Sequence, residues 1–257
     1  MSVASRTITA LRRSQDHVSA LVTGLDGHGL RRSSYAADWS IAQVLSHLGS
    51  QAEIFGLLLD AGLSGGDAPG PDLFPPIWDA WNARSPEEVA ADSLAANEGF
   101  VRRLEALDAT QLDALHLSAF GMELDAAGFL LLRLPEHAIH TWDIAVVLDP
   151  SATVAHDAVE LLIDRLPAMA GLVGKATERP TTLRVQTTEP ERSFALVTDG
   201  VRLEPWTERP HDGVLSLSAE ELLRLVYGRL DAGHAASLRL DASPMTLDDL
   251  RAVFPGV

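Results

Sequence analysis

The clearest helix of the sequence begins in residues 39–48, which read WSIAQVLSHL. Ser40 can accept a hydrogen bond from the amide of Gln43, and the Gln43 side chain can reach back to the amide of Ser40. This pair therefore predicts a capping box at the start of the helix. Apolar residues then recur at helical spacing as far as Gly62. His47 lies at the margin of this apolar stripe, near the point where the interior of a helical bundle would begin.

Three further helices are predicted in the first half of the chain. They cover residues 3–25, 85–107 and about 124–148, the last interrupted by Pro135. Four antiparallel helices joined by connections form a bundle. The connection from Ser64 to about Pro76 is long and rich in glycine and proline, and aromatic residues follow it. We expect the segment 64–81 to pack as a lid or flap, since long loops in compact domains are often functional.

The periodicity of the sequence changes after Asp149-Pro150-Ser151, which we interpret as a domain boundary. A helix is expected near residues 155–175, and Ser218 and Thr246 each precede a further short helix. Short strand-like runs occupy residues 182–187, 193–198, 201–206, 214–217 and 237–240, and Asp199-Gly200 is typical of a hairpin turn. The sequence thus predicts an α+β protein of two domains, a four-helix bundle in 1–149 and a small α+β domain with a mostly antiparallel sheet in 150–257.

The composition excludes several classes of protein. The formal net charge is −16, and an acidic surface repels the phosphate backbone of nucleic acids. The chain has no cysteine, so it can form no disulfide and offers no thiol of its own; this fits a reducing, cytoplasmic location. The first 25 residues contain no unbroken apolar run, so we expect neither a signal peptide nor a membrane span there. Lys175 is the single lysine beside many arginines, which favours a GC-rich, actinobacterial source.

Residues 134–143, LPEHAIHTWD, carry the most visible chemistry. On a helix, Glu136 and His140 are one turn apart and project from the same face, so both can reach one ion. His47 is the candidate for a third ligand from another helix. Two imidazoles and one carboxylate leave a coordination position open, as in catalytic zinc sites, and they also suit ferrous iron. Asp143 is placed to hydrogen-bond a ligand histidine.

Residues 39–48, taken with the Glu136-xxx-His140-xx-Asp143 pattern, resemble the mycothiol-dependent maleylpyruvate isomerase family of the DinB-like metal-binding bundle superfamily. The resemblance extends over the whole chain, with the helical half matching the metal domain and the second half the family's C-terminal α+β domain. It implies that His47, Glu136 and His140 hold a divalent ion, usually zinc.

The same resemblance implies roles for two arginines and for a cofactor. Family members use mycothiol, the low-molecular-weight thiol of actinobacteria. Arg229, in the stretch Val226-Tyr227-Gly228-Arg229-Leu230, looks like a catalytic arginine of the C-terminal domain that faces the cleft. Arg84, just before the third helix, is a candidate contact for the anionic part of the cofactor. The arginine fork suits a substrate carboxylate.

The activity that the resemblance implies is a metal-activated external thiol adding to a small electrophile. If the thiol is eliminated after rotation about the new single bond, the result is cis–trans isomerisation. If the thiol conjugate is kept as the product, the result is S-transfer. The expected partners are the electrophile and the thiol, without nucleic acid or membrane, and the protein would be a monomer or a homodimer. Two other hypotheses stay open: a non-catalytic metal or small-ligand binding module of the same fold, and a ferrous-iron oxygenase with the same ligands.

Overall fold

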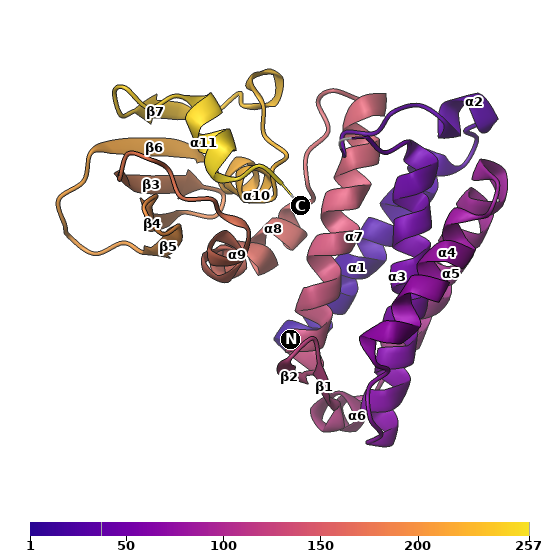
Figure 1. The fold of residues 1–257 in the computed structure, drawn as a ribbon. Helices are drawn as coiled ribbons and strands as arrows, with labels where there is room; N and C mark the ends of the chain where they lie inside the picture. Colours follow the sequence, from indigo (N-terminus) through magenta and orange to yellow (C-terminus); the bar gives the residue numbers. More distant parts are fainter. Residues whose placement is uncertain (37, 257) are drawn as a thin grey trace. The chain divides into compact units, whose positions relative to one another are not determined.

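The computed structural model describes residues 1–36 and 38–256, which form two compact units, Met1–Val154 and Ala155–Val257 (Figure 1). The first unit is a helical bundle and the second contains the larger sheet. A bundle followed by a domain with a mostly antiparallel sheet is the fold class that the sequence predicts, and it is confirmed. The domain boundary expected after Asp149 stays a prediction.

Four long helices build the first unit and lie side by side in Figure 1. Helix α3 packs against α5 and α7, and α1 packs against the same two helices. Their bounds are α1 Val3–Val22, α3 Ile41–Ser64, α5 Pro86–Glu105 and α7 Ala126–Leu148. The capping box predicted at the start of α3 is present, with Ser40 accepting from the Gln43 amide. Fixing this first turn sets which residues of α3 face the interior.

The core between these helices is aliphatic. Burial of such side chains is the main term that holds a bundle together, at roughly 1.5–3 kcal/mol for each fully buried one. One continuous cluster joins α1, α3, α5, α7 and the segment before α3; its buried members include Val18, Leu30, Ile41, Val44, Leu45, Leu48, Val89 and Ile144. The cluster fixes α3 against α7 along the stretch that carries His47.

The shorter elements of the first unit differ from the sequence-based expectation. The part of segment 64–81 from Phe74 onward is helix α4 (Phe74–Asn82), preceded by the short 3-10 helix η1 (Pro71–Leu73). A hairpin also precedes α7 and was not predicted, so α7 begins two residues later than expected, with Asp125 as its N-cap. The remaining short elements are α2 Gly27–Leu30, α6 Ala109–Ala114, β1 His116–Ala119 and β2 Met122–Asp125.

The interruption expected at Pro135 is wrong, because α7 is continuous from Ala126 to Leu148. Pro135 removes one amide from the helix, but packing on both sides of the residue holds the helical path. Leu134 and Pro135 are both buried, as are Arg133 and His137 nearby on α7. Proline in a helix interior is tolerated where the surroundings over-determine the backbone.

The second unit is a five-stranded sheet with short helices. The strand order is β5-β4-β3-β6-β7, and every neighbouring pair is antiparallel except β3 and β6, which are parallel. The strands are β3 Thr182–Thr188, β4 Arg192–Val197, β5 Arg202–Pro205, β6 Gly213–Ser218 and β7 Arg239–Asp241. The turn at Asp199-Gly200 joins β4 to β5, as predicted.

Helices of the second unit contact the sheet through α9 and α10. The helix expected near 155–175 is divided into α8 His156–Leu162, η2 Ile163–Arg165 and α9 Leu166–Val173. The others are α10 Ala219–Val226, η3 Ala232–His234 and α11 Leu247–Val253, and α10 and α11 begin at the predicted caps, Ser218 and Thr246. Over the described part of the chain, each helix is too short or too polar to cross a bilayer.

Helix α4 packs on α3, and the two helices approach most closely where a tryptophan ring meets a glycine. The Trp81 ring is 3 % exposed and lies on Gly49, where an added Cβ would stand 2.2 Å from Cζ3 of the indole. We expect Gly49→Ala to lower the free energy of unfolding by about 1–2 kcal/mol, because the overpacking outweighs the gain in helix propensity. Denaturant unfolding followed by circular dichroism measures the change.

The control is Gly99→Ala in α5, an exposed site where no described atom lies within 4 Å of the added Cβ. That substitution should raise the free energy of unfolding by about 0.5–1 kcal/mol through helix propensity alone. Equal effects of the two substitutions would contradict the packing of α4 on α3.

Candidate metal centre

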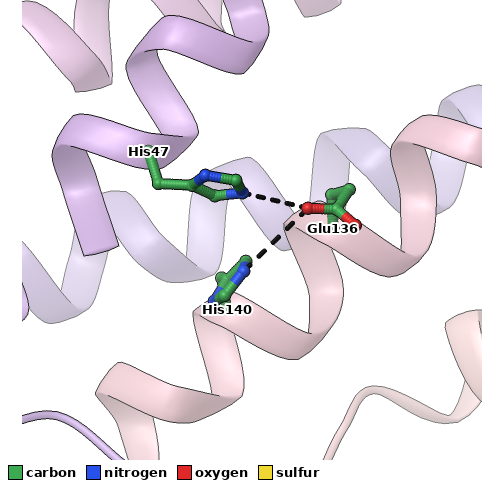
Figure 2. A group of neighbouring side chains, drawn as sticks. All are labelled: His47, Glu136 and His140. Carbon is green, nitrogen blue, oxygen red and sulfur yellow. Dashed lines mark hydrogen bonds and ion pairs between the residues drawn. The ribbon is translucent and has the colours of Figure 1, made fainter. Parts of the chain in front are cut away.

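Three side chains from two helices meet inside the bundle (Figure 2). His47 comes from α3, and Glu136 and His140 come from α7. Nε2 of His47 lies 2.9 Å from Oε2 of Glu136, and Nε2 of His140 lies 3.9 Å from the same oxygen. One ligand atom from each residue lies within 4.8 Å of the other two. The structure therefore brings together the three residues predicted as metal ligands.

A hydrogen bond to Asp143 fixes the orientation of the His140 ring. Its Nδ1 lies 2.9 Å from Oδ2 of Asp143, whose side chain is fully buried. A hydrogen bond from Nδ1 to this carboxylate leaves the lone pair of Nε2 free on the side of Glu136. Such a carboxylate–histidine contact sets the tautomer of metal-binding histidines. Asp143 thus takes the position that its spacing from His140 predicts.

The ring of Trp39 packs against both imidazoles. The Trp39 ring stacks on His140 with centroids 5.8 Å apart and planes 21° apart, and its centroid is 5.4 Å from that of His47. The segment before α3 is held to α7, because the amide of Tyr35 donates to the carbonyl of Asp143 at 2.9 Å. The Tyr35 ring also meets Trp142 edge-on at 4.7 Å. Trp39 is therefore placed by contacts to the same helix that carries Glu136 and His140.

Two of the donors, His47 and Glu136, have the protonation states that a cation requires. Burial lowers the pKa of the His47 imidazole, although the hydrogen bond with Glu136 raises it, so the ring is neutral near pH 7. Burial opposes ionisation of Glu136, but the His47 hydrogen bond, then the charges of His140, His47 and Arg133, outweigh it and lower the pKa to about 2. A neutral imidazole and an ionised carboxylate can bind a metal without first losing a proton.

The donor set fits a divalent ion. Two imidazole nitrogens and one carboxylate oxygen converge, and the side chains are 22 % (His47), 38 % (Glu136) and 11 % (His140) exposed, so the group is neither sealed nor on the open surface. Three protein ligands leave a position for a further ligand, as catalytic zinc sites do. The arrangement can therefore hold a Lewis acid that accepts a small molecule.

Arg84 lies at the start of α5 and is engaged within the protein. Its guanidinium stacks over the Trp81 ring at 3.9 Å, and Nη1 lies 3.2 Å from Oδ2 of Asp92. Both contacts order the connection between α4 and α5. A contact of Arg84 with a cofactor stays a prediction.

Arg229 belongs to the second unit and follows α10. Its side chain is buried, at 8 % exposed, and Nη1 donates to the carbonyl of Tyr227 at 2.8 Å. The glycine before it, Gly228, has a φ of +71°, and an added Cβ there would stand 2.3 Å from Cα of Gly256, so this turn requires glycine. The catalytic role of Arg229 stays a prediction.

Sequence reasoning missed one residue of this region, Arg133. It is fully buried in α7, one turn before Glu136, and its charge is among those that lower the pKa of the Glu136 carboxyl. The signal was available: with Glu136 and His140, Arg133 follows the same spacing of three or four residues along one helix face. An arginine on an otherwise apolar stripe is easily taken for a solvated side chain.

Comparisons with known proteins show the family of the first unit and the fold of the chain. Residues 11–145 match the family described as the mycothiol maleylpyruvate isomerase N-terminal domain. The structure is similar to the crystal structure of the mycothiol-dependent maleylpyruvate isomerase, with a TM-score of 0.68, 15 % sequence identity and 93 % of each chain covered. A variant of that enzyme with one histidine replaced by alanine matches with the same values. At this identity the likeness shows the fold. No curated protein sequence matches the chain.

His137 is a buried histidine of α7 that contacts α1 and not the three donors, and it predicts a pH dependence of stability. It is buried, with Nδ1 2.8 Å from Oγ of Ser14, and burial followed by the charge of Arg133 lowers its pKa well below 6.5. The folded protein keeps this ring neutral, whereas the unfolded chain takes up a proton as the pH falls below 6.5. We therefore expect the free energy of unfolding to fall as the pH is lowered from 6.5 towards 5.

The measurement is denaturant unfolding of metal-free protein at pH 7.5 and pH 5. His137→Gln should reduce the loss of stability between the two values, by up to about 1.4 kcal/mol for each pH unit. His17→Gln, on an exposed face of α1, serves as the control and should leave the difference unchanged. An unaltered difference in His137→Gln would show that His137 is not the group that titrates.

Proposed function

Because the chain belongs to the mycothiol maleylpyruvate isomerase family, we propose that it is a mycothiol-dependent metalloenzyme with one divalent ion, zinc, held by His47, Glu136 and His140. The observation that carries the proposal is the convergence of these donors, one ligand atom from each lying within 4.8 Å of the others. We propose a small unsaturated acid such as maleylpyruvate as substrate and cis–trans isomerisation as the reaction.

Because the chain has no cysteine, the cofactors must supply the reactive thiol and its activation. With no cysteine, the protein has no thiol of its own, so a thiol-dependent reaction needs an external one. A divalent ion at this site would act as a Lewis acid that lowers the pKa of a bound thiol, and the thiol would supply reversible addition to a polarised double bond.

The residues of the chain would bind, orient and shield. Glu136 supplies an anionic ligand and His47 a neutral one, which together leave part of the cation's charge for the incoming group. Asp143 holds the His140 ring so that Nε2 points toward Glu136. Trp39 covers one side of the two imidazoles and limits the access of water there.

The two arginines enter the proposal as contacts for charged parts of the ligands. We assign the substrate carboxylate to Arg229, whose planar guanidinium suits a two-point contact. We assign an anionic part of the thiol to Arg84, which would exchange its contact with Asp92 for the ligand. S-transfer begins with the same thiol addition and differs only in the fate of the conjugate. The proposal places the protein in the actinobacterial cytosol, as a monomer or homodimer.

Metal analysis of the purified protein tests the site. We expect about one zinc ion for each chain in the wild type, and loss of the metal in His47→Ala, Glu136→Ala and His140→Ala because each removes a ligand. Asp143→Asn should keep the ligands but weaken zinc binding by about 10–100-fold, because the support of His140 is altered.

The control for these variants is His17→Ala, which removes an exposed imidazole far from the donors in sequence. It should bind zinc as the wild type does. Equal zinc content in the wild type and in His47→Ala would defeat the metal site.

Activity assays with purified zinc-loaded protein test the reaction. We expect maleylpyruvate to isomerise only when mycothiol is present, and His47→Ala to abolish the thiol-dependent rate. The conjugate is sought by mass spectrometry, since its accumulation would indicate S-transfer. Tight thiol binding without turnover of any electrophile would favour the binding-module hypothesis, and oxygen uptake that depends on added ferrous iron would favour an oxygenase.

A further inference from the structure

Arg133 places a positive charge inside the bundle beside the metal centre. Its side chain is fully buried, and Nη2 donates to Oδ1 of Asn97 at 2.7 Å and to the carbonyl of Leu48 at 3.3 Å. The Phe55 ring lies with its centroid 5.7 Å from the guanidinium carbon. These contacts join α7 to α3 and α5 and hold the charge at a fixed place next to the residue that follows His47.

The fold alone does not account for this arginine. Among the described residues, no group accepts a hydrogen bond from Nε or Nη1, although both atoms are buried. Burying a charge whose donors are only partly satisfied destabilises a protein, and an apolar side chain of similar length would fill the same space without that cost. Burial lowers the pKa of Arg133 to about 10, so the guanidinium remains charged near neutral pH.

The charges around the centre show what Arg133 adds. Glu136 contributes one negative charge as a ligand, and Asp143, fully buried behind His140, contributes another. These two carboxylates balance a divalent cation, since the two imidazoles bind as neutral ligands. Without Arg133 the loaded centre would therefore be neutral, and with Arg133 it carries one net positive charge in a partly buried environment.

We propose that Arg133 determines the ligand specificity of the centre: its buried charge makes the open coordination position prefer an anion, a thiolate or carboxylate, over a neutral ligand. The inference rests on the metal site of the proposed function. Arg133 would act through the electrostatic field of its charge and not as a further ligand, because the guanidinium has no acceptor lone pair and cannot bind the cation itself.

The test uses cobalt(II) as the metal, because its visible spectrum reports each change of ligand. Azide serves as the anionic probe and imidazole as the neutral one, both titrated at pH 8 into cobalt-loaded protein. We expect Arg133→Met and Arg133→Gln to weaken azide binding by about tenfold, the order expected for one unit charge acting through protein of moderate dielectric constant. Imidazole binding should change by less than about twofold, and Arg133→Lys should retain the azide affinity because it retains the charge.

Two neutral variants separate the charge from the packing. Arg133→Met keeps most of the side-chain volume without a polar group, whereas Arg133→Gln keeps an uncharged amide that can donate hydrogen bonds. Thermal unfolding of the metal-free variants reports on the fold independently of the probes.

The results distinguish an electrostatic role of Arg133 at the open coordination position from a purely structural role of its side chain. Azide affinity reduced in both neutral variants, kept in Arg133→Lys and accompanied by unchanged imidazole affinity, supports the proposal. Equal losses for azide and imidazole, or unchanged azide affinity, overturn it while leaving the metal site in place. A wild type that takes up no cobalt, zinc or iron overturns the metal site and the inference together.

Discussion

The contact between Nε2 of His47 and Oε2 of Glu136, at 2.9 Å, is the constraint on which the centre depends. The two residues are 89 positions apart in the sequence, so only the packing of α3 against α7 can bring them together. The aliphatic cluster that includes Val44, Leu45 and Leu48 holds these helices in register. A shift of either helix by one residue would rotate a donor away by about 100° and separate the three side chains.

Placing polar donors inside the bundle requires further polar groups around them. Asp143 is buried to orient His140, Asn97 is buried to receive Arg133, and Ser14 is buried opposite His137. Each group destabilises the fold unless it is hydrogen-bonded, and most of them are. The aliphatic core must therefore compensate for a row of polar side chains along α7, which is a reason for the extensive burial of that helix.

The long helices and the pairing of Glu136 with His140 on one helix face could be predicted because their signals are local. The capping box at Ser40 and the spacing of Glu136 and His140 depend on residues within one or two turns, and each is present as predicted. The hairpin β1–β2 was missed because its strands have only four residues each. Helix α4 was missed because glycine and proline around Pro71 are typical of a loop, and its packing depends on Gly49, a residue of another helix.

The role of Pro135 was misjudged for a related reason, since tertiary packing preserved a helix that local rules would break. Spacing along one helix cannot show which residue of another helix joins Glu136 and His140. The choice of His47 rested more on the family resemblance than on spacing.

The stacking of Trp39 on His140 also gives the molecule an internal optical sensor. The chain has five tryptophans, and among the described residues the ring of Trp39 contacts both His140 and His47. Indole emission responds to the charge and polarisation of a neighbouring imidazole. A ligand bound by His47 and His140 would therefore change the light emitted by Trp39, so its binding could be followed without a label or a chromogenic partner.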